Sequence, residues 1–384
     1  MSFLGALNCG NLLTKWMGDL TPGARMSFRA WGKVLYTPKG GDPQDITTEL
    51  TKYLLSIDYT DNMIGQVDDV TLTLEDRAQL WLSDWHPQRG SKIDITLYMY
   101  NRNGLSEGQL EYKLGTFEID EIEEHMPPAT VQIKAISTTF DGSLRGEKEN
   151  WTWENISIWK CASDIAKKHN LELEWHCEDN PNLDHVEQSD ESDLDFLQKV
   201  VKDAGFALKI TAEKIIIIDE QMQEKGDAKV MFLHPGTVPL TAPTDAEETP
   251  RKVSKFDAYT LKAKTRDTYK ACHVCYQKGK DKEKIEATFT APDKKYGQTL
   301  EVSEQCETVA EAERLAKKKL RDQNKYEVTA SFSTYGDFIY AAGGLVELKN
   351  FGVFDGKYII TKAGLRFGGG FTVNVDMRRC LDGY

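Results

Sequence analysis

Hydrophobic and polar positions alternate along most of residues 25–140. The segments 68–76 and 92–100 place apolar side chains at every second position: Val70, Leu72, Leu74, Ile93, Ile95, Leu97 and Met99. A period of two is typical of strands that bury one face. Two more alternating segments, 115–125 and 129–137, are separated by Pro127 and Pro128, which favour a turn. The pattern predicts β structure throughout this region.

After residue 142 the spacing of apolar positions becomes helical. Residues 157–170 predict an amphipathic helix with Ser157 as its N-cap and Asn170 at its end. Its apolar face consists of Ile158, Cys161, Ala162, Ile165 and Ala166. A short strand at 171–175 and a hairpin at 206–219 complete a small α/β unit, which extends from residue 143 to about residue 225.

The acidic segment 187–205 is either a metal or acid–base site or the start of a helix. In the helical interpretation Ser189 is the N-cap, and Asp190, Glu191 and Asp193 lie in the first turn, where acidic groups favour the helix dipole. Gly205 then ends the helix. Its apolar face is Leu194, Leu197, Val200, Val201 and Ala204. Helix electrostatics explains the acidic residues, so we predict a helix here.

A polar, proline-containing stretch at 240–252 predicts a linker or exposed loop. From residue 253 onward the β pattern returns, interrupted by one helix at 308–320 that begins with the capping box of Thr308 and Glu311. Its expected apolar stripe is Val309, Ala312, Leu315, Ala316 and Leu320. The basic run 317–321 falls in the last turns, where cations favour the dipole, and we expect it to be solvated.

Three segments of the first β region recur in the second, in the same order: 90–97 as 343–350, 115–122 as 356–363, and 129–135 as 371–377. In the middle pair a glycine is followed two residues later by an aromatic residue and four residues later by isoleucine. We interpret this as two copies of one β-barrel-like domain separated by the α/β unit. Two such copies can take two quasi-equivalent places in a ring, so that three chains present a six-fold-like surface.

The 384 residues carry a formal net charge of −13, which argues against a phosphate-binding surface. Seven scattered cysteines, an odd number, favour a reducing compartment over a disulfide framework. No apolar run approaches the roughly 20 residues of a membrane-spanning helix, and the N-terminus lacks the features of a secretory signal. Residues 1–24 are expected to form an apolar arm that folds back on this chain or docks on a neighbour.

The motif CHVC at 272–275 suggests a redox or zinc site, but it lies in an alternating segment. In a strand Cys272 and Cys275 would point to opposite faces, and Cys306 alone does not complete a zinc site. No HExxH, nucleophile elbow, phosphate-binding loop or calcium loop is present. The glycine-rich stretch 366–373 predicts a hairpin connection. We therefore predict no catalytic residue, no cofactor-binding residue and no metal ligand.

Five segments resemble the phage late control protein D family, the baseplate hub proteins of contractile tails, which are similar also to the N-terminal part of type VI secretion spike proteins. They are 67–81, 84–98, 114–123, 157–175 and 186–210. The last is the most specific, since it joins a Gln-Ser-acid-x-Ser-Asp start to an aromatic-Leu pair and a terminal Gly-Phe. The resemblance covers most of residues 25–384.

The resemblance implies an α+β, mainly β fold with two tail-tube-like β-barrel domains and a small α/β unit inserted between them. The expected parts are an N-terminal arm (1–24), a first tube-like β domain (25–142), the α/β insert and linker (143–245), and a second tube-like β domain with one helix (246–384).

It also implies a non-enzymatic homotrimer that joins the hexameric tail tube to the trimeric spike of a phage or a headless bacteriocin. Its partners would be the tail tube, spike, baseplate wedge and tape measure proteins, without stable nucleic-acid binding and without membrane insertion by this chain. It would assemble in the bacterial cytoplasm and reside in the baseplate. Three copies carry a formal charge of about −39, which would repel DNA in a channel, although solubility explains the charge equally well.

Two other classes of protein stay open. A peptidoglycan-degrading enzyme would have its site in the α/β unit, where His176, Glu178 and Asp179 are the first candidates, but no acid, base and nucleophile support one another in the sequence. A glycan- or receptor-binding β protein would use tryptophans as sugar platforms. Five of them lie in patterned segments, which favours packing instead: Trp81, Trp85, Trp153, Trp159 and Trp175.

Overall fold

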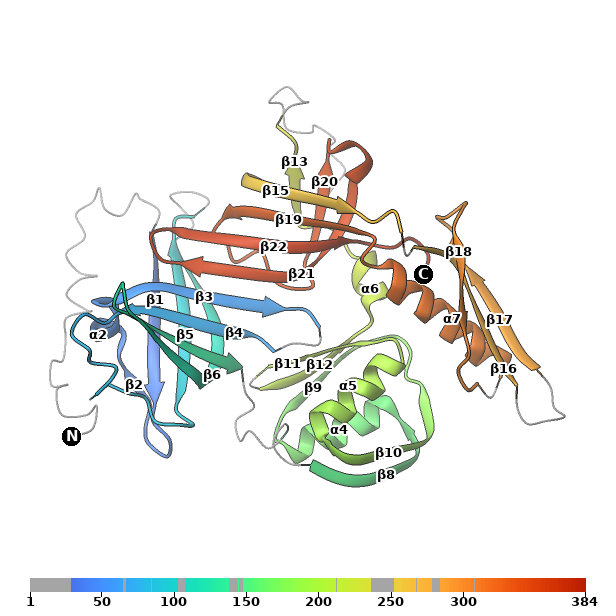
Figure 1. Ribbon diagram of the computed structural model, residues 1–384, viewed down its shortest axis with the longest axis horizontal. Helices are drawn as coiled ribbons and strands as arrows, with labels where there is room; N and C mark the ends of the chain where they lie inside the picture. The colour runs from blue at the N-terminus through green and yellow to red at the C-terminus, as the bar shows by residue number, and fades with distance from the viewer. Residues whose placement is uncertain are drawn as a thin grey trace.

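The computed structural model describes residues 29–64, 67–83, 85–102, 108–137, 144, 148–211, 213–235, 252–266, 268–277, 284–306 and 308–384. The predicted N-terminal arm (1–24) and nearly all of the predicted linker (240–252) lie outside these residues. The chain is mainly β with a few helices (Figure 1), which confirms the predicted α+β, mainly β class. In the described part, no helix combines the length and the apolar character needed to cross a membrane.

The first β region contains a short helix, α2 (Thr47–Thr51), and seven strands. They are β1 (Arg29–Thr37), β2 (Gln44–Asp45), β3 (Leu54–Asn62), β4 (Asp69–Glu75), β5 (Lys92–Tyr100), β6 (Gln109–His125) and β7 (Thr130–Ser137). The predicted alternation is confirmed, because every apolar residue expected to point inward from β4 and β5 is buried. These side chains form one face of the main core.

The second β region contains a 3-10 turn, η2 (Gly352–Phe354), and seven strands. They are β13 (Val230–Leu233), β14 (Lys252–Ser254), β15 (Phe256–Ala263), β19 (Val328–Tyr335), β20 (Leu345–Lys349), β21 (Gly356–Phe367) and β22 (Phe371–Arg379). The glycine-rich stretch is the turn between β21 and β22, as predicted. Both β regions belong to one branched 14-stranded sheet and share one hydrophobic core. Two separate closed barrels therefore remain a prediction.

The two β regions repeat one strand order, and the residue pairs that both copies form agree in register. The first copy has the order β5-β6-β7-β4-β3, and the second has the order β20-β21-β22-β19-β15. Phe117 of β6 lies opposite Ile93, and Tyr358 of β21 lies opposite Val346. The sequence alignment of 90–97 with 343–350 and of 115–122 with 356–363 matches the same residues, Ile93 with Val346 and Phe117 with Tyr358.

Two of the three register shifts in the first copy recur in the second, and the shift between Ile95 and Thr96 does not. Each copy has register shifts at two equivalent places: after Ile119 and Leu54 in the first copy, and after Ile360 and Phe256 in the second. A β-bulge is a specific local feature and does not arise from strand alternation alone. The coincidence of both bulges confirms the internal repeat and extends it from three segments to five strands.

The two copies meet edge to edge within the chain. The first half of β21 pairs with β20, and its second half pairs antiparallel with β3, from Lys362 opposite Asn62 to Phe367 opposite Ile57. Figure 1 shows β3 and β21 side by side where the two regions join. This β3–β21 junction makes the sheet continuous through both copies.

The α/β unit lies between the two β regions in sequence and has its own core. Its elements are β8 (Lys148–Ser157), α4 (Ile158–Lys168), β9 (Glu172–His176), β10 (Asn182–Ser192), α5 (Asp193–Asp203), β11 (Ala207–Ile210), β12 (Lys214–Ile218) and α6 (Glu220–Lys225). In Figure 1, α4 and α5 lie between the β8–β10 pair and the three-stranded β11-β12-β9 sheet. The hairpin of β11 and β12 confirms the prediction for residues 206–219.

The two predicted helices of this unit differ in their outcome. For α4 the prediction is confirmed: the Ser157 side chain accepts the N–H of Lys160, and the whole expected apolar face is buried. For α5 the predicted N-cap is wrong, since the cap is Ser192 and Ser189 lies in β10. Because β10 pairs with β8 as far as Ser192, the acidic residues before it belong to a strand. Gly205 ends this helix at φ +89°, as predicted.

The predicted helix and the CHVC strand belong to a further layer with its own core, which was not expected as a separate unit. It consists of β16 (Tyr269–Gln277), β17 (Lys284–Thr290), β18 (Gln298–Val302) and α7 (Val309–Asn324). Thr308 caps α7 by accepting the N–H of Glu311, as predicted. Two details are wrong: Val309 is exposed, and Arg321 of the basic run is buried rather than solvated. Arg321 is buried because α7 extends beyond the predicted end and packs against α6 and the C-terminal residues.

Candidate interaction surface

A buried charge cluster holds the α/β unit against both β copies. Lys209 of β11 binds Asp61 of β3, and its Nζ lies 3.3 Å from Oδ2 of Asp68. Asp61 also accepts a hydrogen bond of 2.8 Å from the backbone N–H of Ala342, which precedes β20. Burial opposes the charge on Lys209, but Asp61 and Asp68 outweigh it and raise the pKa of Lys209. The cluster fixes the α/β unit beside the β3–β21 junction.

A second buried cluster positions α7. Arg378 of β22 binds Glu220 and Glu224 of α6, each at 2.6 Å, and Arg321 binds Glu224 at 2.5 Å. Glu224 also accepts the backbone N–H of Leu381 at 3.0 Å. A buried charge without partners is costly, so these mutual contacts stabilise one arrangement of α6, α7 and the chain end. The two clusters attach the α/β unit and α7 to the shared sheet.

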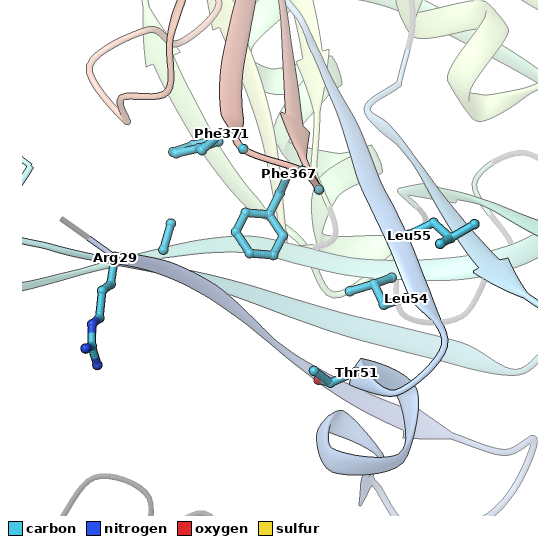
Figure 2. Close-up of a pocket in the computed structure, with 10 residues that line it drawn as sticks. Arg29, Thr51, Leu54, Leu55, Phe367 and Phe371 are labelled. Atoms are coloured by element: carbon cyan, nitrogen blue, oxygen red, sulfur yellow. The ribbon is translucent and has the colours of Figure 1, made fainter. Parts of the chain in front are cut away.

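A groove of about 360 Å³ lies next to the junction, and its lining residues are drawn in Figure 2. Leu54 and Leu55 of β3 lie on one side of it, Arg29 of β1 lies on the other, and Phe367 and Phe371 come from the strands above. The complete lining is Arg29, Ala30, Thr51, Leu54, Leu55, Phe367, Gly368, Gly369, Gly370 and Phe371. The groove exposes apolar surface where the two copies meet, and such surface is suited to contacts with another protein.

A wider cleft of about 1030 Å³ lies between α5 and β10 on one side and α7 on the other. Both signs of charge line it, including Asp184, Glu187, Lys199 and Arg314. Lys318 of α7 spans the cleft by donating to the backbone carbonyl of α5 residue Asp203 at 2.7 Å. This mixture of charges is typical of a hydrated gap between two layers rather than of a site for one charged ligand.

The candidates for an enzymatic site are not brought together. His176 is exposed at the end of β9, where its Nε2 lies 3.5 Å from Glu174 Oε2. Glu178 and Asp179 follow in a loop, and Asp179 accepts the N–H of Asn180. In the described ranges, no hydrogen bond or ion pair joins His176 to either acid. The arrangement supplies no nucleophile with a neighbouring base.

The cysteines of CHVC lie on opposite faces of β16, as predicted. Cys272 is fully buried against the α7 layer, and Cys275 is half-buried on the outer face. One further group on that outer face, Glu286, comes from the neighbouring strand β17, so its proximity could not be predicted from spacing along the sequence. Single ligand atoms of His273, Cys275 and Glu286 lie within 4.8 Å of one another.

These three residue types suit a zinc ion. However, the ammonium group of Lys284 lies 2.5 Å from Glu286 Oε2, and a His273 ring nitrogen lies 2.8 Å from Thr288 Oγ1. Lys284 therefore takes the place next to the carboxylate that a cation would need. The geometry supports a surface ion pair with neighbouring polar groups.

Most of the tryptophans considered as sugar platforms serve in packing. Four of them pack against another aromatic ring. The distances between ring centroids are 5.7 Å for Trp81 and Trp85, 6.4 Å for Trp153 and Phe196, and 5.7 Å for Trp175 and Phe206. Trp159 is 43% exposed and differs from the others. The packing interpretation is therefore confirmed for four of the five.

The fold is that of phage tail proteins. The 43 kDa tail protein of prophage MuSo2 from Shewanella oneidensis superposes with a TM-score of 0.66 over 92% of this chain and 100% of that chain, at 11% identity. The structure of the Francisella PdpA-VgrG complex gives a TM-score of 0.56 over 96% of this chain and 61% of the matched chain, at 9% identity. At these identities the likeness concerns the fold alone.

In sequence, the chain is similar to two proteins named probable baseplate hub protein. That of Escherichia phage 186 is 28% identical over 180 residues, and that of Escherichia phage P2 is 29% identical over 183 residues. Each match covers 46% of this chain. The chain spans 42% of the phage 186 protein and 43% of the phage P2 protein, which is less than half the length of either relative. No family model matches the chain. The resemblance to baseplate hub proteins is thereby confirmed, and neither relative is named as an enzyme.

Proposed function

We propose that this chain is a structural baseplate hub of a contractile tail or tail-like injection particle. It acts as a homotrimer in which each copy contributes two tube-like domains (25–142 and 246–384), with the α/β insert and linker (143–245) between them. The linker part adds β13 to the sheet of the second β region. Three chains then offer six equivalent places to a hexameric tail tube and a threefold base to a trimeric spike. The role is mechanical, and the chain performs no catalysis.

The observation that carries this proposal is the agreement of order, register and bulges between the two sets of five strands. Units that take equivalent places around an axis must offer equivalent edges to their neighbours. Two copies that differed in register could not do so. The similarity to baseplate hub proteins supports the same conclusion independently.

The partners follow from this position in the particle. We propose the tail tube, spike, baseplate wedge and tape measure proteins as neighbours, supported by the fold shared with a tail protein and with a structure of a VgrG complex. The net negative charge favours no stable complex with nucleic acid. Assembly takes place in the bacterial cytoplasm, and the finished particle carries the chain in its baseplate.

A reconstruction of the tail tip by electron microscopy, without imposed symmetry, tests the proposal. Three copies around a channel, with two similar β units from each, are expected. Quantitative mass spectrometry of purified tails should give equal numbers of this chain and of the spike chain. A monomer that is absent from tails would contradict the hub function, and cell-wall cleavage lost on His176→Ala would favour the enzyme instead.

A further inference from the structure

The β3–β21 junction has a counterpart that the single chain does not use. In the repeat, β3 corresponds to β15, and the second half of β21 corresponds to the second half of β6. Within the described residues, β15 pairs only with β19, and residues 121–125 of β6 pair only with β7. The two edges needed for a second junction are therefore both open.

The two open edges lie at the ends of one continuous run of strands. The order is β15-β19-β22-β21-β3-β4-β7-β6, and Figure 1 shows β15 and β6 on opposite sides of the β3–β21 junction. In the single chain these two edges lie apart and do not pair with each other. Open strand edges attract pairing with another chain, so a folded protein needs to cover them.

We propose that β15 of one copy pairs antiparallel with the second half of β6 of a neighbouring copy of this chain. The inference rests on the proposed trimer and adds its contact surface. The register is obtained by replacing each residue pair of the β3–β21 junction with the equivalent residues of β15 and β6. It places Glu121 opposite Lys264, Ile122 opposite Ala263, Glu123 opposite Lys262, Glu124 opposite Leu261, His125 opposite Thr260, and Met126 opposite Tyr259.

The charges on the two edges are complementary in this register. Glu121 and Glu123 face the neighbour's Lys264 and Lys262, and opposite charges directly across a strand pair stabilise it. Within one chain, Lys134 lies 2.7 Å from Glu121 and 3.2 Å from Glu123. One lysine thus serves two carboxylates, and the neighbour's lysines compensate the remaining negative charge.

The exposed apolar residues support the same register. Met126 is 75% exposed and Tyr259 is 42% exposed in the single chain. Their equivalents at the β3–β21 junction are Phe367, which is half-buried, and Ile57, which is 1% exposed. These side chains are more exposed at the open edges than their equivalents are at the β3–β21 junction, which supports a second copy of this chain as the partner that covers them.

The pairing runs head to tail around a ring. Each copy offers β15 to one neighbour and β6 to the other, so the two contact surfaces of a copy differ. The junction inside the chain and the junction between chains use equivalent strand edges. Both therefore relate one β unit to the next by the same rotation about the ring axis. Three chains then close a ring with alternating internal and intermolecular junctions.

Engineered disulfides test the register. Residues directly opposite in an antiparallel pair have Cα atoms about 4.5–5.5 Å apart, within the range of a disulfide. A chain with Met126→Cys and Tyr259→Cys should give covalent dimers and closed trimers on oxidation. The matched control combines Met126→Cys with Ala263→Cys, because Ala263 lies four residues away, about 13 Å along the strand. Wild type and both single variants measure the background from native cysteines.

Charge exchange tests the complementarity without new cysteines. Lys262→Glu should raise the dissociation constant of the trimer about tenfold, and Glu123→Lys should do the same. The double variant should recover to within about threefold of wild type, which a folding defect would not do. Lys202→Glu, at an exposed position of α5, is the control for net charge and should leave assembly unchanged. Sedimentation equilibrium measures all four.

The outcomes separate this inference from the hub proposal. Three copies in the tail tip, without cross-linking at Met126 and Tyr259 or with equal cross-linking in the control pair, would overturn the register and leave the hub function intact. A particle without three copies of this chain would overturn the hub function itself. Specific cross-linking together with recovery in the double charge variant supports both.

Discussion

Phe117 and Tyr358 occupy the same position in two copies of one strand pattern. Each follows a glycine of positive φ by two residues, each is fully buried, and each faces an aliphatic residue of the preceding strand. The equivalence continues through five strands and includes two bulges in each copy. A structural constraint found in one copy can therefore be compared directly with its equivalent in the other.

The turn between β21 and β22 provides a matched pair of glycines. A Cβ on Gly368 would lie 2.2 Å from the Leu55 carbonyl oxygen, whereas Gly369 has open space, and both have positive φ. We expect Gly369→Ala to cost about 1 kcal/mol of unfolding free energy, from backbone conformation alone, and Gly368→Ala to cost about 3 kcal/mol. Urea unfolding measures both values. Equal losses would show that the close approach to β3 contributes nothing.

The Asp193 carboxylate connects α4, β10 and α5. Its oxygens lie 2.8 Å from Lys168 Nζ, 2.7 Å from His169 Nε2 and 2.8 Å from Gln188 Nε2. Burial alone would raise the pKa of Asp193, but these hydrogen bonds outweigh it and lower the pKa below its usual value of 3.8. The ionised form therefore stabilises the folded state.

The sign of the pH dependence follows from that shift. Because the folded-state pKa lies below the unfolded-state value, the stabilisation is complete above the unfolded-state pKa and is lost as the pH falls through the folded-state pKa. Asp193→Asn should cost about 2 kcal/mol at neutral pH and flatten the acid limb of the curve. Thermal melts between about pH 2 and pH 7 measure this. An unchanged acid limb would contradict the assignment.

Glu224 is the shared partner of two buried arginines. Glu224→Ala leaves Arg378 and Arg321 with less compensation and removes the acceptor of the Leu381 N–H, so we expect a loss of about 4 kcal/mol. Glu187→Ala, at an exposed pair with His185, should change stability by less than about 0.5 kcal/mol. Denaturant titration compares the two. Hydrogen exchange at the chain end should rise only in the Glu224 variant.

Thiol labelling tests the two faces of β16. Burial raises the pKa of Cys272 to about 11, and that of Cys161 in α4 to about 12, so both should react slowly at about pH 8. Cys275 lies half-buried on the outer face and should be alkylated before either of them. Peptide mass spectrometry over time measures the rates, with denatured protein as reference. Cys272 reacting as fast as Cys275 would contradict its packing against α7.

The sequence by itself determined the features that depend on neighbouring residues. Strand alternation in β4 and β5, the Ser157 cap of α4 and the Thr308 cap of α7 were all predicted, because periodicity and capping act over a few residues. The repeat was also visible, since equivalent positions need similar side chains. The open edges of β15 and β6 could have been found from sequence only by extending that repeat from three segments to five strands.

Only the tertiary structure decided which distant segments meet. The α5 cap moved from Ser189 to Ser192 because β8, some forty residues earlier, pairs with β10 and holds the intervening residues in a strand. Arg321 became buried because Glu224 and the C-terminal residues lie beside it. The continuity of the sheet likewise depends on β3 meeting β21, about three hundred residues apart. Local pattern specifies which face of an element is apolar, but the partner that covers this face is chosen by packing across the whole chain.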